Sequence, residues 1–473
     1  MKLRISEILE CTGGTLLAAN EDEINRIVEG LTWDSREVTA GKVFVALPGE
    51  RVDGNDFIVK AVLAGAGCII CTRDPKPNEL AMAGEFTCPI IQVADGVVAV
   101  GAVASLWRSR LRGLVIGVTG SCGKTSTKDM LKSVLSQRFS VSATEGNHNN
   151  ELGVPLTILN TASDCEILIV EMGMRGLGQI KQLCDIARPT VGIVTNVGVC
   201  HLELLGSREN IAQAKSELIA SLPPTGLAVV CGDDDMTSLL LEKADALVRG
   251  VRVCRFGVNE GNFTHVSNLA FDSAGKASFD LAFGQRDSFH LALGMPGKHN
   301  VVNALSVACV ADHLGLSPEM MAAGFAQEGS SKMRMEIVKA ANGITFINDA
   351  YNANPSSMAA ALDTLAGMSV DGRRVAILGD MGELGSDEAS MHAQVGEHAA
   401  TSNLDLLVCV GELSANIAQG AADAGFAKER IVAFNNLDDC IDSLSNLLEA
   451  GDTVLVKASR FMGLERVISE MES

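Results

Sequence analysis

Short apolar runs recur along the chain, and longer stretches of mixed apolar and polar residues separate them. In the first hundred residues, the runs 42–47 and Cys68–Cys71 are typical of buried strands. The proline- and charge-rich stretch 73–78 indicates a loop, and an alanine- and valine-rich stretch predicts a helix over 97–110. The chain therefore begins as an alternation of short strands and helices.

The same alternation continues through most of the remaining sequence. An apolar run at Leu114–Thr119 leads into a glycine turn and a helical stretch near 126–137. Further strands are expected, with helical stretches between them, at 166–170, 191–195 and 226–230. Strands joined by such crossovers favour a parallel sheet. The pattern becomes alternating and strand-like near 251–293, and from about 333 the β/α alternation returns, with strands expected at 344–348, 374–378, Leu406–Val410 and Thr453–Lys457.

These elements predict an α/β protein with several domains. A length of 473 residues corresponds to about three domains, expected at 1–97, 98–330 and 331–473. Apolar residues make up 47% and charged residues 20%, which excludes wholesale disorder. Aromatic residues contribute only 4%, so helices packed on sheets are favoured over an aromatic-rich β-sandwich.

The charge balance narrows the range of partners. The chain carries 58 acidic against 38 basic residues, a net charge of −20. Binding to nucleic acid or to an anionic membrane needs a surplus of lysine and arginine, so both are disfavoured. A small anionic substrate remains possible, because local amides and one lysine are enough to hold a phosphate.

The number of cysteines and the first ten residues indicate in which cellular compartment the protein is expected. Thirteen scattered cysteines indicate free thiols and a reducing environment. Cys68 and Cys71 form a CxxC pair with no second pair downstream, so we interpret them as core sulfurs rather than zinc ligands. The first ten residues carry acids where a signal peptide is apolar, and no apolar run approaches the ~20 residues of a membrane span. A soluble, cytoplasmic protein is expected.

A glycine turn between a strand and a helix carries the strongest chemical signal. In Thr119-Gly-Ser-Cys-Gly-Lys-Thr125, two glycines allow backbone amides to approach phosphate oxygens at a helix N-terminus. Lys124 would neutralise the β- and γ-phosphates, and the Thr125 hydroxyl would hold Mg²⁺. The nucleotide-binding residues predicted here are Gly120, Ser121, Cys122, Gly123, Lys124, Thr125 and Ser126. The alternative is a glycine turn that binds nothing.

Three polar residues further along the chain are candidates for the same site. Glu171 follows a predicted strand, and an acid at the end of a strand beside a phosphate loop suits the metal ion of a nucleotide. His201 follows another strand of the same sheet, and Lys215 lies on a predicted helix. Taken alone, the three residues also fit a strand-end charge, a structural histidine and a solvated lysine.

The loop sequence is similar to that of a known family. Val118 stands where a strict phosphate-loop motif has its first glycine, and the shortened form TGSxGKT resembles the ATP loop of the Mur ligase family. These enzymes join an amino group to a carboxylate at the expense of ATP. The resemblance implies that His201 is a ligand of a second Mg²⁺ and that a carbamylated Lys215 helps to position that ion. The implied metal-site residues are Thr125, Glu171, His201 and Lys215.

A second segment matches the family's adenine site. Gly297-Lys-His-Asn-Val-Val-Asn-Ala304 corresponds to the G-x-H-N-x-x-N-A segment whose asparagines hold the adenine. This match implies an adenine-binding role for Asn300 and Asn303, whose amides offer both a donor and an acceptor. Helix capping by Asn300 is the alternative.

The last third of the chain completes the implied nucleotide site. Arg334 resembles the arginine that reaches the γ-phosphate when the domains close, and a planar bidentate cation suits a transferring phosphoryl group. Asp349 resembles the ribose-binding acid, with Tyr351 and Asn352 in the same loop. A proline- and asparagine-rich turn is the alternative. The implied catalytic residues are Lys124, His201, Lys215 and Arg334.

Other segments are similar to one branch of the family, which adds a dipeptide to a UDP-linked tripeptide. They lie at 145–155, 348–355, 379–385 and 456–460. The family usually has glycine where this chain has Ala458. The N-terminal Trp33-Asp-Ser-Arg36 looks like part of the family's uridine-binding domain. The substrate-binding residues implied by these matches are Ser35, Arg36, Asn147, Asn149, Asn150, Asn354 and Arg460.

The resemblance therefore implies an architecture and a reaction. A central P-loop ATPase domain with a parallel sheet is expected between an N-terminal α/β domain for UDP and a C-terminal Rossmann-like domain. The implied ligands are ATP, two Mg²⁺ ions, UDP-N-acetylmuramoyl-tripeptide and D-alanyl-D-alanine. The two peptides would be joined through an acyl phosphate, in an ADP-forming step of peptidoglycan synthesis. A monomer that binds neither nucleic acid nor membrane is expected.

Three alternatives compete with this interpretation. The neighbouring ligase that adds a single diamino acid or lysine carries a D-N-P-R-type motif, which this chain lacks. Folylpolyglutamate synthetases lack the UDP-binding domain. A P-loop binding protein without ligase chemistry would keep Lys124 and Thr125 but would not need His201, Lys215 and Arg334 together.

Overall fold

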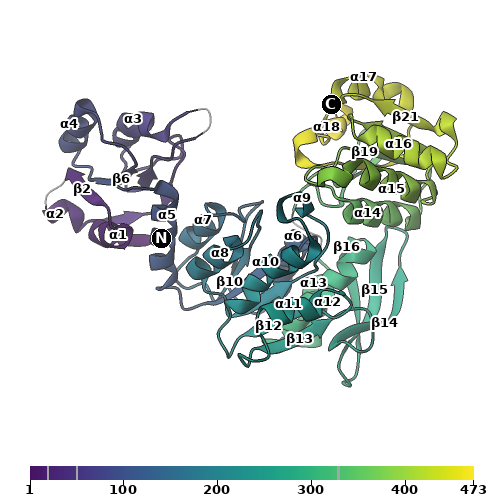
Figure 1. Ribbon diagram of the computed structural model, residues 1–473, viewed down its shortest axis with the longest axis horizontal. Coiled ribbons are helices and arrows are strands. Elements are labelled where there is room, and N and C mark those ends of the chain that lie inside the picture. The colour runs from purple at the N-terminus through teal and green to yellow at the C-terminus, as the bar shows by residue number, and fades with distance from the viewer. Residues whose placement is uncertain (19–20, 50–51, 328–330, 473) are drawn as a thin grey trace. The chain divides into compact units, whose positions relative to one another are not determined.

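The computed structural model describes residues 1–18, 21–49, 52–327 and 331–472 (Figure 1). The chain divides into two compact units. The first contains Met1–Gly117, Phe139–Met174 and Gly178–Thr190, and the second contains Val118–Arg138, Arg175–Leu177 and Val191–Ser473. Each unit is described by itself. The expected boundaries near 97 and 330 stay predictions.

The N-terminal part of the first unit is built on a five-stranded sheet. Its strands run in the order β2 (Thr15–Ala18), β7 (Ile90–Gln92), β6 (Cys68–Cys71), β5 (Val43–Val45) and β4 (Leu31–Thr32). All pair in parallel except β2 with β7. Phe44, Ile69 and Ile90 form its buried core together with α3 (Ile58–Leu63). A second, two-stranded sheet pairs β1 (Lys2–Arg4) with β3 (Ile27–Glu29). The CxxC sulfurs are buried in β6, as expected.

The rest of the first unit is a helix-covered strand group. Strands β8 (Leu114–Thr119), β10 (Ile167–Glu171) and β9 (Val141–Ala143) neighbour one another in that order. Helix α5 (Gly96–Arg108) packs on α7 (Gly153–Asn160) and α8 (Gln179–Ala187). Asp95 begins α5 by accepting hydrogen bonds from the amides of Val97 and Val98. The Trp107 indole donates to the Thr161 carbonyl at 3.1 Å, so its polar atom is satisfied inside this packing.

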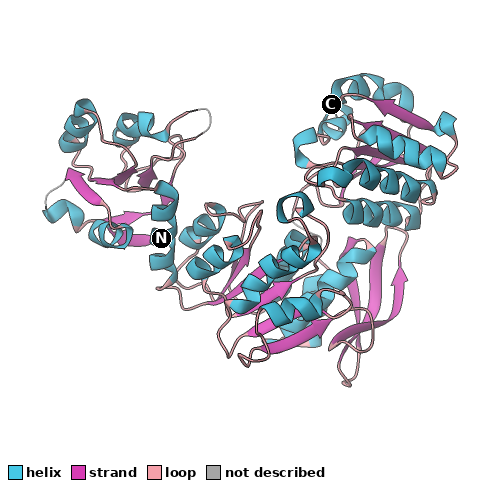
Figure 2. Ribbon diagram, in the orientation of Figure 1, coloured by secondary structure: helices cyan, strands magenta, loops and turns pink. Residues whose placement is uncertain are grey.

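The second unit begins with a mixed sheet. Strands β11 (Val191–Val194), β12 (Leu227–Cys231), β13 (Arg252–Phe256) and β14 (Thr264–Phe271) pair in parallel. Strands β15 (Lys276–Phe283) and β16 (Phe289–Pro296) continue the sheet antiparallel (Figure 2). The alternating pattern near 251–293 predicted strands in this region but not their direction. Helix α6 (Lys124–Leu135) packs on α12 (Lys298–His313) and α13 (Pro318–Phe325). The other helices of this part are α9 (Leu202–Leu205), α10 (Arg208–Ala220) and α11 (Thr237–Lys243).

The C-terminal part of the second unit is a doubly covered sheet. Its strands run β17 (Glu336–Lys339), β18 (Thr345–Asn348), β22 (Thr453–Lys457), β19 (Arg374–Gly379), β20 (Leu406–Val410) and β21 (Ile431–Phe434). Only the edge strand β17 is antiparallel. Successive residues of β19 enter opposite cores, as an apolar strand covered on both faces requires.

Helices cover both faces of this sheet (Figure 1). One core contains side chains of α14 (Pro355–Gly367), α15 (Glu388–Ala400) and α16 (Ser414–Asp423). The other contains side chains of α17 (Leu437–Leu447) and α18 (Arg466–Glu472). The Rossmann-like arrangement predicted for this region is therefore confirmed.

Most expected strands are present within a residue or two. The helix expected near 126–137 begins earlier, at Lys124, because Gly123 forms its N-terminal cap. The short strands β17 and β21 were not predicted, since each has at most half-buried residues and lacks a long apolar run. In the part of the chain that the structure describes, no helix has the length and apolar character needed to cross a membrane.

Candidate active site

The predicted phosphate loop connects the end of β8 to α6 inside the second unit. Gly120 and Gly123 have φ angles of 149° and 80°, in the region that favours glycine. A Cβ atom on Gly120 would lie 1.8 Å from the Thr195 hydroxyl oxygen, and one on Gly123 would lie 2.4 Å from the Asn303 amide oxygen. Both positions therefore require glycine, for backbone conformation and for space.

The loop is fastened to the segment that follows β11. The Ser121 amide donates to the Asn196 carbonyl at 3.1 Å, and the Cys122 amide donates to the Asn196 side-chain oxygen at 3.0 Å. The Thr195 hydroxyl donates to the Cys122 carbonyl at 2.5 Å. These contacts fix the loop backbone at the N-terminus of α6, where amides attract anions. Sequence reasoning did not assign Thr195 and Asn196 a role, although Thr195 ends the expected strand and Asn196 follows it directly.

The charged and hydroxyl groups of the loop are positioned on α6. The Lys124 ammonium donates to the carbonyls of Gly120 and Ser121 at 2.7 and 3.3 Å, so it lies over the loop. Thr125 and Ser126, in the first turn of the helix, are buried. The loop residues thus form a compact turn at the start of α6, and their role in binding phosphate stays a prediction.

Lys215 is a buried lysine of the second unit. It lies on α10 and is 1% exposed. Burial, together with the positive charge of Lys124, lowers the pKa of Lys215 to about 7. Cys200 and Cys122 have the opposite effect but do not outweigh them. At neutral pH, Lys215 is therefore a neutral amine in a large fraction of the protein molecules. The alternative of a solvated helix lysine is wrong, because the α10 face that carries Lys215 is buried.

His201 contacts an acid from the C-terminal part of the second unit. Its Nδ1 lies 2.6 Å from the Glu383 carboxylate, which also lies 3.5 Å from Arg175. Burial lowers the pKa of His201, and the Glu383 charge partly opposes this shift. Both His201 and Glu383 have left-handed backbones, with φ of 64° and 60°. Such conformations cluster at functional sites. Glu383 belongs to the segment 379–385 but had no predicted role.

The two predicted adenine residues form a buried pair at the start of α12. Asn303 donates to the Asn300 side-chain oxygen at 3.1 Å, and Asn300 donates to the Pro296 carbonyl at 2.7 Å. Gly297, not Asn300, forms the N-terminal cap of α12, so the capping alternative is wrong. Asn303 lies beside Gly123, which places the pair next to the phosphate loop.

The predicted γ-phosphate and ribose residues lie around the end of β18. The Arg334 guanidinium stacks over the Tyr351 ring, 4.2 Å from its centroid. The Asp349 carboxylate accepts a hydrogen bond from the Met335 amide at 3.1 Å and forms an ion pair with Lys457 at 2.5 Å. Lys457 is buried and also donates to the Asn352 carbonyl at 2.9 Å. Lys457 was quoted in a motif but had no predicted role.

His299 is a further unpredicted neighbour of this group. Burial lowers the pKa of His299, with Asp349 opposing and Lys457 adding to the shift. Its Nδ1 is buried and has no hydrogen-bond partner among the described residues. A buried ring nitrogen of this kind is available to a ligand.

Two predicted substrate residues lie in the same C-terminal part of the second unit. Asn354 begins α14 by accepting a hydrogen bond from the Ser357 amide at 2.9 Å, and its own amide nitrogen donates to the sulfurs of Cys122 and Cys200. Arg460 forms an ion pair with Glu465 at 2.5 Å and is half exposed. Asn354 is therefore buried against the loop, whereas Arg460 is accessible.

The remaining candidates lie in the first unit. Asn149 donates to the Glu171 carboxylate at 2.9 Å, and the Gly173 amide donates to the Asn149 carbonyl at 2.8 Å. Glu171 is 2% exposed, and its second carboxylate oxygen has no hydrogen-bond partner among the described residues. Asn147 and Asn150 are exposed, and the Asn150 side chain accepts from the Gly153 amide at the start of α7.

The predicted uridine residues are on the surface of the first unit. The Arg36 guanidinium is bound to both carboxylate oxygens of Asp34, at distances between 2.6 and 3.1 Å. This pair lowers the pKa of Asp34 to about 2. The Ser35 hydroxyl accepts from Lys60 at 3.4 Å. Ser35 and Arg36 are thus available to a ligand, on a short loop after β4.

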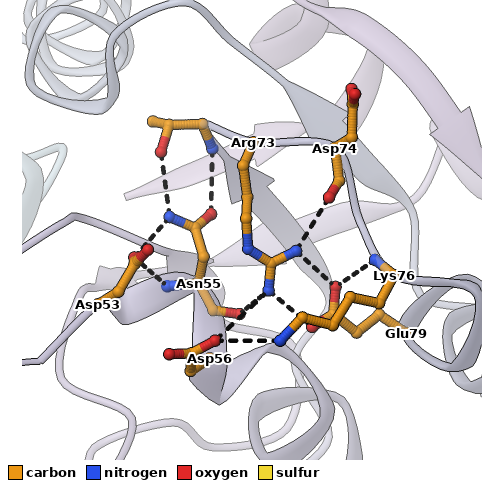
Figure 3. A network of polar contacts seen from close by, with 8 residues as sticks. Asp53, Asn55, Asp56, Arg73, Asp74, Lys76 and Glu79 are labelled. Carbon is orange, nitrogen blue, oxygen red and sulfur yellow. Dashed lines mark hydrogen bonds and ion pairs between the residues drawn. The ribbon is translucent and has the colours of Figure 1, made fainter.

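A polar network supports the neighbouring loop of this sheet (Figure 3). Arg73 donates to both oxygens of Glu79 at 2.8 and 2.9 Å and to the Asn55 carbonyl at 2.9 Å. The Asn55 amide in turn donates to Asp53 at 2.7 Å, and Lys76 lies 3.3 Å from Asp56. Glu79 is buried, and its bidentate pair with Arg73 is the centre of this network.

Within the described residues, no three histidine, cysteine, aspartate or glutamate side chains gather in a way that could hold a metal ion by themselves. Mg²⁺ with a nucleotide needs few protein ligands, because phosphates and water complete its octahedron. The unpartnered oxygen of Glu171 in the first unit and the buried Thr125 hydroxyl in the second unit are each oxygen donors of the kind that Mg²⁺ binds.

Comparisons with known proteins cover nearly the whole chain. The family description "Mur ligase middle domain" matches residues 118–311, "Mur ligase, glutamate ligase domain" matches 333–460, and "Mur ligase family, catalytic domain" matches 27–105. The UDP-N-acetylmuramoyl-tripeptide–D-alanyl-D-alanine ligase of Bacillus subtilis is 34% identical over 472 residues, covering 100% of this chain and 98% of the relative.

Solved structures give the same result. A crystal structure of MurF from Acinetobacter baumannii matches with a TM-score of 0.87 and 30% identity, over 100% of this chain and 99% of that chain. The MurF ligase of Thermotoga maritima in complex with ADP matches with a TM-score of 0.79 and 30% identity, over 94% of this chain and 97% of that chain. The predicted three-domain α/β architecture is thereby confirmed.

Proposed function

Because the chain belongs to the Mur ligase family, we propose that it joins D-alanyl-D-alanine to UDP-N-acetylmuramoyl-tripeptide and converts ATP to ADP and phosphate. The observation that carries this proposal is the group formed by the glycine-shaped loop, Lys124 and the buried Lys215 in one unit with Arg334 and Asp349. The full-length likeness to relatives named for this reaction supports it.

The chemistry follows from the poor reactivity of a carboxylate. The terminal carboxylate of the tripeptide attacks the γ-phosphorus of ATP, and ADP leaves. The resulting acyl phosphate has a good leaving group. The neutral amine of D-alanyl-D-alanine then attacks the acyl carbon, and inorganic phosphate leaves from the tetrahedral intermediate. No covalent bond to the protein is needed, so Cys122 is not a nucleophile in this scheme.

Residues of the second unit would hold and neutralise the nucleotide. The loop amides and Lys124 would bind the β- and γ-phosphates, and Arg334 would stabilise the charge on the transferring phosphoryl group. Asn300 and Asn303 would hold the adenine, and Asp349 the ribose, with Tyr351 and Asn352 beside it. Lys457 holds the Asp349 carboxylate in place.

Two magnesium ions belong to the proposal. Thr125 and Glu171 would hold one, and His201 with a carbamylated Lys215 would position the other. Bound Mg²⁺ spreads the negative charge of the phosphoryl group. The neutral amine that burial favours at Lys215 is the form that reacts with carbon dioxide, and the product carries a carboxylate-like charge.

Each unit contributes candidate residues for the other substrates. Ser35 and Arg36 would contact the UDP part, and Asn147, Asn149 and Asn150 the rest of the UDP-linked substrate. Asn354 and Arg460 are our candidates for the dipeptide. We further propose domains at 1–97, 98–330 and 331–473, and a cytoplasmic monomer.

The test is phosphate release from ATP and Mg²⁺ in the presence of UDP-N-acetylmuramoyl-tripeptide, with and without D-alanyl-D-alanine. We expect release only with both substrates, together with a pentapeptide product identified by mass. Release with a single free amino acid would assign the chain to a neighbouring ligase. Absence of substrate-dependent release would refute ligase chemistry.

A further inference from the structure

Two of the three accessible cysteines lie together at the phosphate loop. Ten of the thirteen cysteines are buried, and only Cys11, Cys122 and Cys200 are partly accessible. Cys122 is in the loop itself, and Cys200 precedes His201 at the start of α9. Cys11 is on α1 (Ile5–Thr12), in the first unit. The proposed ligase reaction uses none of these thiols.

The two loop sulfurs share one hydrogen-bond donor. The Asn354 amide nitrogen lies 3.1 Å from the Cys122 sulfur and 2.8 Å from the Cys200 sulfur. The sum of these two distances is the upper limit of the sulfur–sulfur separation. The Cys200 thiol also forms a hydrogen bond with the Cys122 sulfur. The sulfurs are therefore neighbours, and they need to approach to the ~2.05 Å of a disulfide for the bond to form.

From this geometry we propose that Cys122 and Cys200 are a redox-sensitive pair, which hydrogen peroxide converts to a disulfide that disables the phosphate loop. The disulfide itself depends only on the two thiols. Its inhibitory effect rests on the proposed ATP site.

The reaction balances with one peroxide. The Cys122 thiolate attacks a peroxide oxygen, which gives a sulfenic acid and hydroxide. The Cys200 sulfur then attacks the sulfenic sulfur, the S–S bond forms, and the leaving hydroxide is released as water. Overall, two thiols and one hydrogen peroxide give one disulfide and two water molecules.

The surroundings favour Cys122 as the first thiol to react. The hydrogen bonds from Cys200 and Asn354, together with the positive charges of Lys124 and Lys457, lower the pKa of Cys122 against the effect of burial. The thiolate is the nucleophilic form, so it is present at neutral pH. Most other cysteines are buried away from an oxidant.

A disulfide at this place would alter the loop. The Cys122 backbone is already bonded on both sides to Thr195 and Asn196, so pulling its side chain toward Cys200 must shift the adjoining amides. It would also remove the sulfur acceptors of Asn354. A displacement of about 1 Å in a binding site costs roughly a hundredfold in rate. We therefore expect ATP turnover to fall by about tenfold or more on oxidation and to return with dithiothreitol.

The direct test is peptide mapping of the full chain after peroxide treatment and thiol blocking. Trypsin releases Cys122 in peptide 113–124 and Cys200 in peptide 182–208. We expect these peptides to be linked, with fragmentation placing the bond at Cys200 rather than at the buried Cys184 in the same peptide. Absence of the linked peptide, or linkage through Cys184, would overturn the proposal.

Two variants sharpen the test. Cys11→Ser removes the third accessible thiol and should still give the linked peptide and the reversible loss of turnover. Cys200→Ser should keep its turnover when reduced, give no linked peptide, and accumulate a sulfenic acid at Cys122 that dimedone labels. A linked peptide without loss of turnover would overturn the proposal that the disulfide disables the phosphate loop. No turnover in the reduced protein would refute the proposed function but leave the disulfide test intact.

Discussion

The polar network of the N-terminal sheet and the polar group at the phosphate loop are built on opposite principles. In the first, the buried Glu79 is matched by two hydrogen bonds from Arg73. In the second, the buried Lys215 is close enough to Lys124 for the like charge to act on it. A matched buried charge fixes a structure, whereas a buried charge beside a like charge is held ready for a ligand or a reaction.

The pKa values of the two groups express this difference. Burial by itself raises the pKa of Glu79, but the hydrogen bonds from Arg73 and the Lys76 amide outweigh it, and the pKa falls below its usual range. At Lys215, burial and Lys124 act in the same direction and bring the pKa to about 7. The first region keeps its charge at neutral pH, and the second partly loses it.

The largest expected effect is on the phosphate loop. Lys124→Ala removes the cation that lies over the loop carbonyls, and we expect kcat to fall by about a hundredfold to a thousandfold, as for loss of one charge-stabilising donor. Phosphate release measures this. Lys132→Ala, an exposed lysine on the same helix, is the control and should keep its kcat. Equal loss in both variants would contradict the assignment.

The N-terminal network should respond in stability instead. Arg73→Met leaves Glu79 buried without its bidentate partner, and we expect a loss of roughly 3 kcal/mol in the free energy of unfolding. Urea denaturation measures this quantity. The double variant Arg73→Met with Glu79→Leu should recover part of the loss. A double variant as unstable as the sum of the two single variants would mean that the pair is not coupled.

Arg334 tests the second region through kinetics. Arg334→Ala removes the guanidinium that we assign to the γ-phosphate, and kcat should fall by about tenfold to a hundredfold while affinity for the UDP-linked substrate changes little. Arg286→Ala provides a matched control, since Arg286 also stacks over an aromatic ring, Phe283, at 4.8 Å. Equal losses in turnover and UDP-substrate affinity would refute the role.

The last expected effect is a pH-dependent gain in stability. Between pH 7 and 10.5 the unfolded chain binds a proton at Lys215 that the folded protein does not, so wild-type stability rises with pH in this window. Lys215→Met removes this cost of burial, which is about 4 kcal/mol at pH 7 for a pKa of about 7 against 10.5, and we expect the gain to fade as the pH approaches 10.5.

Thermal unfolding in buffer free of carbon dioxide measures this gain and prevents carbamylation. Lys132→Met, the exposed counterpart, should show no pH-dependent difference from wild type. If the stability difference between Lys215→Met and wild type is constant from pH 7 to pH 10, the lowered pKa is wrong.

The sequence predicted the elements and motifs that depend on local signals. The loop glycines, the strand ends and the covered apolar strands all follow from residue type and spacing. Contacts made across the fold were not predictable in this way. Examples are the fastening of the loop by Asn196, the pairing of Lys457 with Asp349, and the contact of Glu383 with His201.

Lys215 shows the same limit most clearly. A lysine on a helix with many polar residues is expected to be solvated. Only the packing of α10 shows that the Lys215 side chain is buried. The edge strands β17 and β21 escaped prediction for the related reason that partial burial leaves no long apolar run. The difference between the Arg73–Glu79 network and the group at the phosphate loop therefore comes from burial in the folded structure rather than from residue type.

The most direct test of the central claim follows oxygen atoms through the reaction. The terminal carboxylate of the tripeptide is labelled with ¹⁸O at both oxygens, and the phosphate formed during ligation is analysed by mass. If the γ-phosphoryl group passes through the carboxylate, each phosphate carries one ¹⁸O atom and the pentapeptide retains the other. Phosphate without ¹⁸O would show that ATP is hydrolysed by water, and would contradict the acyl-phosphate account of this site.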